Sequence, residues 1–323
     1  MAIVFEEMSQ IGVKRPSFSF EILPPLKGAG LDRLRSVVEM LREFNPSYIN
    51  ITTHSSEYKY TELPGGLMRR TVLRRRPGTV AVAAALQYEY GIQVVPHILC
   101  QGFTREETEY VLLDLQFLGM THVLALRGDK ARVPHLTKPD QPADSNLHAT
   151  DLIAQINDFN AGRFIDGSER EPLAVPFTFG VACYPEKHEE APNRETDLAY
   201  FKQKVELGAK YGVTQLFYDN EAYFNFAQRA QAAGINVPII PGLKPFTKIS
   251  QLTTIPKTFH CSLPEALVSE ATKCKTDDDA RSLGIEWGIY QARELLSKGN
   301  VSGLHFYSMG AAESIREIAR AIF

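Results

Sequence analysis

The chain has 323 residues, a length that suits two average domains or one α/β barrel. Hydrophobic residues make up 44% of it, aromatic residues 10% and charged residues 23%, which is typical of a globular protein and excludes disordered, fibrous and disulfide-stapled classes. The 35 basic residues against 38 acidic ones give a net charge of −3, which provides no field that would attract nucleic acid. We therefore expect a small-molecule partner and no nucleic acid.

Nothing in the sequence directs the chain to a membrane or out of the cell. The opening residues include Glu6 and Glu7 and lack the basic start and apolar stretch of a secretory signal. No apolar run reaches the roughly 18 residues of a membrane span. The four cysteines contain no C-x-x-C pair and are too few for a secreted disulfide framework. We expect a cytoplasmic protein with reduced thiols and no membrane partner.

Short runs rich in β-branched and aromatic residues alternate with longer stretches of helical period. Each run predicts a strand. In chain order the eight runs are Ser17–Ile22, Tyr48–Thr52, Val94–Ile98, His122–Arg127, Phe177–Cys183, Thr214–Tyr218, Val237–Gly242 and Leu304–Tyr307.

The stretches between the strands carry helix signals. An apolar stripe at three- and four-residue spacing runs from Leu31 to Leu41. Thr104 and Glu107 have the spacing of a capping box, and Gly119 follows the last turn of the helix that they open. Further helices are predicted to open at Thr196 and to cover Tyr223–Ala233, Ile285–Lys298 and Ala312–Ile322.

The βα order, repeated eight times, predicts an α/β fold in which residues 1–323 form a single-domain (β/α)8 TIM barrel. We expect the longest loops at Lys130–Asn146 and Lys244–Asp279, and such barrels build their sites from loops at the carboxyl ends of strands. Five arginines between Arg69 and Arg76 have helical spacing and are interpreted as a solvated helix face, with an anionic ligand tail as the alternative.

Polar residues are predicted to point into the barrel at the ends of most strands. Strict alternation in the first strand turns Phe18 and Phe20 toward the helices and Ser19 and Glu21 inward. Glu21 could equally form a structural pair with a basic neighbour such as Arg127 or Lys27. The same parity turns further polar residues inward on other strands, and it favours a site over a core: Asn50, Thr52, His97, His305 and Tyr307.

Metal and dinucleotide motifs are absent from the sequence. His97, His188 and His305 lack the spacing of a zinc site, so buried core histidines are the simpler interpretation and we expect no metal. Gly28-Ala29-Gly30 lacks the third glycine of a dinucleotide fingerprint, and there is no P-loop. Phosphate groups, if bound, are bound in another way.

Seven motifs stand in register at the ends of successive strands: F-S-F-E-I-L-P-P at Phe18–Pro25, P-H-I-L-C at Pro96–Cys100, L-A-L-R-G-D at Leu124–Asp129, Y-P-E-K-H at Tyr184–His188, T-Q-L-F-Y-D at Thr214–Asp219, I-I-P-G at Ile239–Gly242 and H-F-Y at His305–Tyr307. Together they resemble the methylenetetrahydrofolate reductase family over nearly the whole chain. The resemblance implies a barrel that binds FAD non-covalently and reduces 5,10-methylenetetrahydrofolate to 5-methyltetrahydrofolate with NADH or NADPH. That reaction belongs to one-carbon metabolism and methionine biosynthesis.

The resemblance also implies roles for residues around the folate. Glu21 matches the general acid, which protonates the folate nitrogen so that the methylene bridge opens to an iminium able to accept hydride. An amine leaves poorly unless it is protonated, and burial can raise a carboxyl pKa toward neutral pH. The positions that match substrate contacts are Asp129, Gln215, Gln251 and Tyr307.

For the flavin, the resemblance implies a larger set of contacts. Arg127, His188 and Lys204 would suit the pyrophosphate, and Asp197 would suit sugar hydroxyls. The full set is Thr52, Thr53, His97, Arg127, Gly128, Asp129, His148, Ala149, Ala182, Tyr184, His188, Asp197 and Lys204.

The sequence departs from the family pattern in several places, one of which is the loop Lys130–Asn146, which is longer than usual in the family. The family commonly reads H-F-Y-T-L-N-R, so an arginine expected at the glutamate end of folate is replaced here by Ala311. Thr53-His54-Ser55 replaces a smaller, glycine-containing turn beside the flavin. The chain ends at the barrel, so we expect a catalytic domain alone, with no regulatory domain and no inhibition by adenosylmethionine.

Two other functions stay open at this point. One is a metal-dependent barrel lyase that uses His97, His188 and His305, and the other is a flavin-binding module without turnover. The sequence does not choose between NADH and NADPH, and it leaves a homo-oligomer open.

Overall fold

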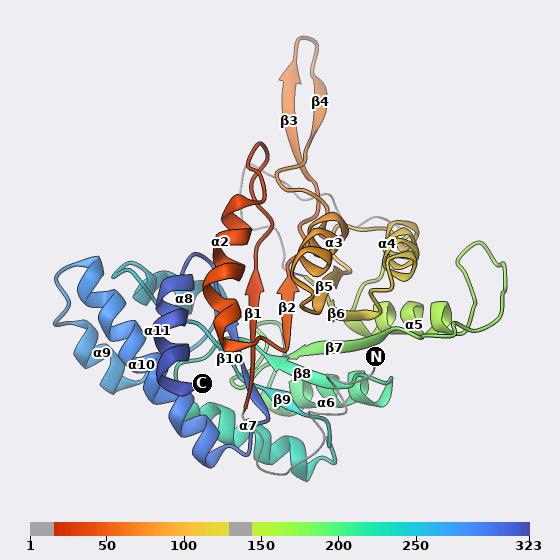
Figure 1. The fold of residues 1–323 in the computed structure, drawn as a ribbon. Helices are drawn as coiled ribbons and strands as arrows, with labels where there is room; N and C mark the ends of the chain where they lie inside the picture. The colour runs from red at the N-terminus through yellow and green to blue at the C-terminus, as the bar shows by residue number, and fades with distance from the viewer. Residues whose placement is uncertain (1–15, 129–143) are drawn as a thin grey trace. The chain divides into compact units, whose positions relative to one another are not determined.

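The computed structural model describes residues 16–128 and 144–323, so Asp129 and most of the predicted loop Lys130–Asn146 lie outside the described residues (Figure 1). The strands are β1 (Ser17–Ile22), β2 (Tyr48–Ile51), β3 (Glu57–Leu63), β4 (Leu67–Leu73), β5 (Val94–Leu99), β6 (His122–Leu126), β7 (Thr178–Cys183), β8 (Tyr211–Thr214), β9 (Ile239–Ile240), β10 (Gly242–Leu243) and β11 (Gly303–Tyr307). The α-helices are α2 (Asp32–Leu41), α3 (Thr79–Tyr90), α4 (Arg105–Phe117), α5 (Ala149–Asn160), α6 (Arg194–Glu206), α7 (Asn220–Ala232), α8 (Gln251–Phe259), α9 (Glu265–Ala271), α10 (Asp277–Lys298) and α11 (Ala312–Ile322), and a short 3-10 helix covers Arg42–Phe44.

All strands except β3 and β4 belong to one sheet, in the order β10-β11-β1-β2-β5-β6-β7-β8-β9. The printed registers of this sheet, such as that between β7 and β8, are parallel. Parallel neighbours joined through helices are the arrangement that the repeated βα pattern predicted. The fold is therefore a TIM-barrel-like α/β fold, which confirms the predicted fold class.

The chain divides into two compact units. Unit 1 contains the described residues 16–22, 35–49 and 180–323, and unit 2 contains 23–34, 50–128 and 144–179. Strands β2 and β7 each have residues in both units.

In unit 1, the two faces of β1 have different surroundings. Phe18 packs among aromatic rings, with its ring centroid 5.7 Å from that of Phe44 and 5.6 Å from that of Phe306. On the other face, the Oγ atom of Ser19 lies 2.9 Å from Nδ1 of His305. The alternation that predicted apolar residues on one face of β1 and polar residues on the other is therefore confirmed.

In unit 2, β5 pairs in parallel with β6, with His97 opposite Leu124. Helix α4 follows β5 and begins with the predicted capping box. Thr104 Oγ1 accepts from the Glu107 amide at 3.0 Å, and Glu107 Oε2 accepts from the Thr104 amide at 2.9 Å. These bonds satisfy two of the amide groups that a helix start leaves open, and the prediction of this helix start is confirmed.

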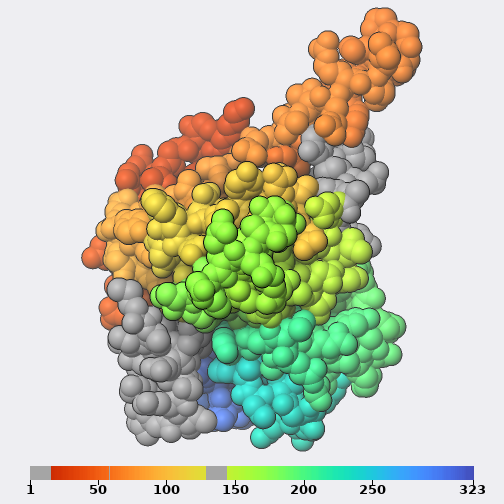
Figure 2. All heavy atoms as spheres, turned by 90° about the vertical axis from the view of Figure 1, so that its right-hand side faces the viewer, coloured from red at the N-terminus to blue at the C-terminus, as the bar shows by residue number. Residues whose placement is uncertain are grey.

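The interpretation of the arginine cluster as a helix face was wrong. Strands β3 and β4 form an antiparallel hairpin, with Thr61 opposite Arg69 and Leu63 opposite Leu67. Gly65 and Gly66 between them adopt φ angles of 85° and 74°, which glycine reaches without strain and tight hairpin turns require. This turn signal outweighs the helical spacing of the arginines. Figure 2 shows the hairpin, in orange, projecting into solvent.

Two predicted strands differ from the structure by more than one residue at an end. Of the run Thr214–Tyr218, Thr214 is the last residue of β8 and the rest is the loop that leads to α7. Asp219 Oδ1 accepts from the Glu221 amide at 3.0 Å and caps that helix. The run Val237–Gly242 contains β9 and the first residue of β10. Pro241 lies between these two strands. Proline has no amide hydrogen to donate to a sheet ladder, so it interrupts the strand.

Three helix predictions are also corrected. The segment Lys244–Asp279, predicted as a loop, contains α8 and α9. Helix α10 begins at Asp277, well before the predicted start at Ile285, because a capping box of Thr276 and Asp279 opens it. Helix α6 begins at Arg194, and its cap is Asn193, whose side chain accepts from the Thr196 amide at 2.8 Å. Helices α10 and α6 begin earlier than predicted because their polar capping residues lie before the first residues of the apolar pattern.

Helix α10, with 22 residues, is long enough to compare with a membrane span. Across the described ranges, however, no helix combines that length with the apolar character that a bilayer crossing needs.

Candidate active site

The carboxyl ends of β1, β11 and β10 bring three ionisable side chains together in unit 1. Glu21 in β1 is opposite Tyr307 in β11, and Leu243 in β10 is opposite Phe306 in β11. Lys244 directly follows Leu243 at the end of β10, as Tyr307 directly follows Phe306 in β11. Glu21 and Lys244 are only 7% and 4% exposed. We call Glu21, Tyr307 and Lys244 the Glu21 cluster.

Burial controls the charges of the Glu21 cluster. Burial raises the pKa of the Glu21 carboxyl to about 8, although the positive charge of Lys244 by itself lowers that pKa. Burial also lowers the pKa of the Lys244 ammonium to about 8, although the negative charge of Glu21 by itself raises that pKa. In both groups the desolvation of the charged form is the larger effect. Glu21 is therefore mostly protonated at neutral pH and can act as a proton donor.

Lys244 is a site residue that the sequence interpretation missed. The basic neighbours considered for Glu21 were Arg127 and Lys27, but the charge that acts on its pKa comes from Lys244. A sequence signal existed, because Lys244 follows the I-I-P-G motif by two positions and shares the parity of Gly242.

Tyr307 is held by close packing around the carboxyl end of β8. Its hydroxyl donates to the carbonyl oxygen of Thr214 at 2.6 Å. A Cβ atom at Gly242 would lie 2.4 Å from that same oxygen and 2.6 Å from the Tyr307 ring, which is too close for any residue but glycine. Burial raises the pKa of Tyr307 well above its usual value of 10, so the hydroxyl stays neutral. The glycine of I-I-P-G is therefore needed to seat Tyr307.

His305 lies on the same strand as Tyr307 and is fully buried. Its Nδ1 atom is 2.9 Å from Ser19 Oγ, and its ring stacks on Tyr48 with centroids 6.1 Å apart at an angle of 12°. These contacts are those of a core histidine, which was the simpler of the two interpretations of this residue.

A second cluster in unit 1 contains five of the predicted flavin positions. The Lys204 ammonium donates to the Ala182 carbonyl at 2.5 Å, and Asp197 Oδ2 accepts from the His188 amide at 3.1 Å. Burial lowers the pKa of Lys204 and raises that of Asp197, and their mutual attraction opposes both shifts. The structure therefore brings these predicted residues together, and we call them the Lys204 cluster: Ala182, Tyr184, His188, Asp197 and Lys204.

The loop that carries Tyr184 and His188 is fixed by local contacts. Their rings meet edge to face, with centroids 4.8 Å apart. The Glu190 amide donates to His188 Nδ1 at 3.1 Å, so a neutral His188 ring carries its proton on Nε2. The Lys187 ammonium donates to three carbonyl oxygens of the same loop, at 2.9 to 3.2 Å. The Y-P-E-K-H motif thus forms a rigid loop with a defined histidine tautomer.

In unit 2, two of the predicted flavin positions, Thr53 and His97, lie together. The Thr53 hydroxyl donates to the His97 carbonyl and lies 2.6 Å from the hydroxyl of Thr79. Thr79 in turn donates to the Thr52 carbonyl at 3.0 Å. Burial lowers the pKa of His97 to about 3, so its ring is neutral. Thr79 at the start of α3 was missed by the sequence interpretation and ties the end of β2 to this helix.

Unit 2 also contains buried polar atoms that lack partners. Neither polar side-chain atom of Asn50, which is fully buried, nor Oγ1 of Thr52 has a hydrogen-bond partner among the described residues. Gly128, directly after β6, has a φ of 88°, and a Cβ there would lie 3.1 Å from the Cβ of Gln101. Unsatisfied buried groups are costly, so such atoms commonly mark the place of a ligand.

The remaining predicted flavin positions of unit 2 lie near Cys100. The Cys100 thiol is within 3.4 Å of the Leu126 carbonyl and 3.3 Å of the His148 carbonyl, which fixes the start of α5 before Ala149. Burial raises the pKa of Cys100 to about 12, so the thiol stays protonated. The His148 side chain is exposed. The main-chain carbonyl oxygen of Arg127 accepts from the Gln101 amide at 2.8 Å and so holds the loop after β5.

The predicted folate contacts Gln215 and Gln251 are both in unit 1, and each side chain makes a local hydrogen bond. Gln215 Oε1 accepts from the Leu216 amide at 2.9 Å. Gln251 Oε1, at the start of α8, accepts from the Thr247 amide at 2.6 Å. These bonds use both amide oxygens as acceptors, and the NH2 group is the donor part of each side chain.

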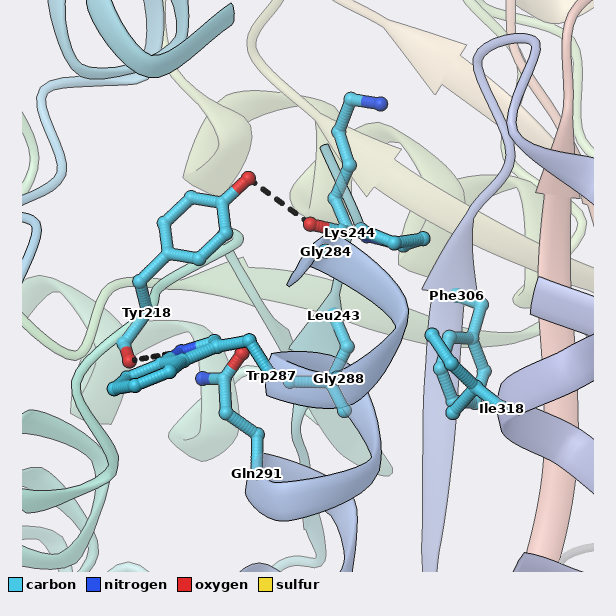
Figure 3. A pocket seen from close by; sticks show the side chains of 10 residues that line it. Tyr218, Leu243, Lys244, Gly284, Trp287, Gly288, Gln291, Phe306 and Ile318 are labelled. Carbon is cyan, nitrogen blue, oxygen red and sulfur yellow. Dashed lines mark hydrogen bonds between the residues drawn. The ribbon is translucent and has the colours of Figure 1, made fainter. Parts of the chain in front are cut away.

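A pocket in unit 1 supports the backbone of Lys244 (Figure 3). The Tyr218 hydroxyl donates to the Lys244 carbonyl at 2.9 Å, and Trp287 Nε1 donates to the Tyr218 carbonyl at 3.1 Å. Figure 3 shows the Lys244 side chain directed away from Trp287 and Gln291. The pocket wall thus holds the main chain while the ammonium points elsewhere.

The sequence profile of the methylenetetrahydrofolate reductase family matches residues 7–322 of this chain. The chain belongs to this family. The match covers the Glu21 cluster, the Lys204 cluster and the polar groups of unit 2, and it confirms the resemblance drawn from the seven motifs.

Two relatives show how much of the family protein the chain represents. It is 29% identical over 313 residues to a probable methylenetetrahydrofolate reductase (NADPH) from Caenorhabditis elegans, covering 97% of this chain and 43% of the relative. It is 26% identical over 295 residues to the 5,10-methylenetetrahydrofolate reductase of Escherichia coli (strain K12), covering 91% and 86%. The chain thus spans less than half the length of the nematode relative and most of the bacterial one.

A solved structure shares the fold of this family member. It is an uncharacterized protein from Clostridium thermocellum that binds two copies of 5-methyl-5,6,7,8-tetrahydrofolic acid, with a TM-score of 0.57 and 16% identity. The superposition covers 96% of this chain and 95% of that one. At this identity the likeness supports the TIM-barrel-like fold.

The metal-dependent alternative has no ligand set in the described chain. Among the residues that the structure describes, no group of three or more His, Cys, Asp or Glu side chains could hold a metal ion. His305 contacts Ser19 and Tyr48, and His188 accepts from Glu190, as described above. These histidines serve separate local roles.

Proposed function

We propose that this chain reduces 5,10-methylenetetrahydrofolate to 5-methyltetrahydrofolate, using electrons from NADH or NADPH and a non-covalently bound FAD. The observation that carries the proposal is Glu21, a carboxyl group buried at the end of β1, whose pKa burial raises to about 8. A buried, protonated carboxyl at a strand end is the proton donor that opening of the methylene bridge needs.

Glu21 acts by general acid catalysis in this proposal. Its O–H bond breaks, and an N–H bond forms on the folate nitrogen that leaves the methylene carbon. The bond between that nitrogen and carbon then breaks, because a protonated amine is a good leaving group. Glu21 is left as a carboxylate, and a proton from water restores it in a later step.

FAD, when bound, supplies the hydride that the methylene carbon accepts. In unit 1 the Lys204 cluster suits its polar parts. The Lys204 ammonium and the Nε2–H group of His188 would donate to the pyrophosphate, and the carboxyl of Asp197 would bind sugar hydroxyls. Ala182 and Tyr184 would complete this contact.

In unit 2 the unpartnered atoms of Asn50 and Thr52 fit a polar ligand such as a flavin. Gly128 lets the main chain approach closely, since its φ of 88° and its tight contact with Gln101 both disfavour a side chain. Asn50 is added here to the predicted flavin set. The other members from this unit in the proposal are Thr53, His97, Arg127, His148 and Ala149.

The folate contacts remain those that the family resemblance implied: Asp129, Gln215, Gln251 and Tyr307. Ala311, at the start of α11, is 3% exposed and carries no charge. It therefore provides no ionic contact for the glutamate part of folate, which in this proposal is bound without the arginine common in the family. The whole chain would act as one catalytic domain.

The test is a pair of half-reactions on the purified protein. We expect flavin absorbance, bleaching of that absorbance by NADH or NADPH in the absence of oxygen, and its return on addition of 5,10-methylenetetrahydrofolate. Comparing the two nicotinamides in the first step would identify the donor.

The competing functions give different results in the same experiment. A flavin-binding module would show flavin absorbance without bleaching or without reoxidation by the folate. A metal-dependent lyase would show neither flavin absorbance nor a folate-dependent signal. Either outcome would contradict the proposal.

A further inference from the structure

Lys244 is unusual among the basic residues of unit 1. Its side chain is 4% exposed, yet its Nζ atom has no hydrogen-bond partner among the described residues. A buried ammonium without a partner opposes folding, because it has lost the hydration that stabilised it. Such a group is more often retained for chemistry than for stability.

The sheet register places Lys244 beside the predicted acid. Glu21 is opposite Tyr307 across β1 and β11. On the other flank of β11, Lys244 directly follows Leu243 of β10, which is opposite Phe306, the residue before Tyr307. Figure 3 shows that the Lys244 side chain points away from the pocket formed with Trp287. Tyr307 is neutral and its hydroxyl is committed to Thr214, so it separates the two groups without changing their charge.

We propose that Lys244 is a positioning residue for Glu21, and that its ammonium stabilises the carboxylate that Glu21 becomes after donating its proton. This inference rests on the proposed role of Glu21 as the acid. It assigns to Lys244 a contribution to proton transfer that acts through Glu21, with no contact to the reacting atoms.

Charge compensation explains why a lysine can be useful here. A buried carboxyl that gives up a proton becomes an isolated buried anion, which is a costly product in a medium of low dielectric constant. A nearby ammonium lowers that cost without taking part in bond making, so the acid is stronger than burial alone would allow. Among the described residues, the charge that acts on the pKa of Glu21 is that of Lys244. On the neighbouring strand β11, His305 is buried and Tyr307 is partly buried.

Lys244→Met is the direct test, with Lys248→Met as the matched control. Methionine fills a similar volume without the charge, and Lys248 is exposed four positions further along the chain. Isotope-edited infrared spectra of protein with labelled glutamate would follow protonation of Glu21 against pH, with Glu21→Gln identifying its band. We expect the midpoint to rise by about one pH unit in Lys244→Met, the size of an ordinary single-charge effect, and to stay in place in Lys248→Met.

The half-reactions show whether this coupling matters for turnover. In Lys244→Met we expect the low-pH rate of folate-dependent flavin reoxidation to fall by up to about tenfold, because Glu21 is a weaker acid, and the alkaline limb of its pH profile to move upward. Flavin reduction by the nicotinamide should stay unchanged. Lys244→Arg, which keeps the charge, should restore the midpoint and the limb.

The outcomes separate failure of this inference from failure of the proposed function. An unchanged Glu21 midpoint in Lys244→Met would overturn the role of Lys244, even if Glu21→Gln loses the folate half-reaction. A shifted midpoint with no effect of Glu21→Gln on that half-reaction would keep the coupling and overturn the proposed acid. A parallel loss of both half-reactions in Lys244→Met without a shifted limb would show a structural role only.

Discussion

Two lysines of unit 1, Lys204 and Lys244, have their pKa values lowered by burial but differ in what surrounds the ammonium. Lys204 donates to the Ala182 carbonyl and faces Asp197, which accepts from the His188 amide. Lys244 has no hydrogen-bond partner among the described residues, and the charge that acts on it is that of Glu21.

This difference in hydrogen bonding around the two ammonium groups indicates two different functions of a buried charge. In the Lys204 cluster each charged group is hydrogen-bonded, so the cluster is rigid and suited to holding a ligand in place. In the Glu21 cluster the Lys244 ammonium has no hydrogen-bond partner among the described residues, and burial brings the pKa values of Glu21 and Lys244 to about 8, so both groups can exchange protons near neutral pH. This contrast supports the proposed binding role of the Lys204 cluster and the proposed proton-transfer role of the Glu21 cluster, and each role can be tested.

The largest expected effect is on Glu21. Glu21→Gln keeps the size of the side chain but has no carboxyl proton to donate, so folate-dependent reoxidation of the flavin should fall by roughly 10²- to 10⁴-fold. Stopped-flow absorbance would measure both half-reactions, and reduction by the nicotinamide should remain within a small factor. Glu206→Gln, on the exposed end of α6, is the control. Near-normal reoxidation in Glu21→Gln would exclude this residue as the acid.

The next largest effect concerns Lys204. Lys204→Met should weaken FAD binding by about one to two decades, because a charge-assisted hydrogen bond contributes roughly 1.5–3 kcal/mol. Equilibrium dialysis or flavin fluorescence would measure the dissociation constant. Lys202→Met, an exposed position two residues earlier, should bind FAD normally. Equal affinities in the two variants would remove Lys204 from the flavin site.

A smaller effect is expected at Gly242, which supports the Glu21 cluster through packing. Gly242→Ala should lower the free energy of unfolding by about 1–3 kcal/mol, because the added Cβ would overlap the Thr214 carbonyl and the Tyr307 ring. Denaturant unfolding would measure it. Gly30→Ala, where an added Cβ meets open space, should change stability little. An unfolding free energy equal in both variants would show that Tyr307 can move aside.

The smallest effect is expected from thiol modification. Burial raises the pKa of Cys100 and Cys261 to about 12 and that of Cys183 further, so these three thiols are protonated and unreactive. Treatment with a small alkylating reagent should leave turnover intact, and mass spectrometry would count the modified sites. Stoichiometric inactivation with FAD still bound would contradict this expectation.

Local sequence patterns predicted the elements that rest on alternation and capping. The alternation of Phe18, Ser19 and Phe20 gave the orientation of β1, and the spacing of Thr104 and Glu107 gave the start of α4. These features depend on neighbours in the chain, so a single sequence reveals them.

Features that depend on partners distant in sequence were missed. The hairpin of β3 and β4 was hidden because the arginine spacing was weighed above the turn at Gly65 and Gly66. Lys244 was missed because its significance depends on Glu21, which is more than two hundred positions earlier and is reached only through the registers of β1, β11 and β10. The alternation along each strand could place Glu21 and Lys244 on a face of the sheet, but it could not show that the two residues are neighbours.

The measurement that tests the contrast between the two lysines most directly is the unfolding free energy of Lys244→Met against Lys204→Met. Both should be measured with and without added FAD, so that stabilisation by bound ligand is separated from that of the protein itself. Without FAD, we expect Lys244→Met to be at least as stable as the unmodified chain, because it removes an unpartnered buried charge and Glu21 stays protonated and neutral. We expect the free energy of unfolding of Lys204→Met to fall by about 1–3 kcal/mol, because the Ala182 carbonyl loses its hydrogen-bond donor and Asp197 loses a favourable positive charge. A loss in Lys244→Met as large as that in Lys204→Met would contradict the account.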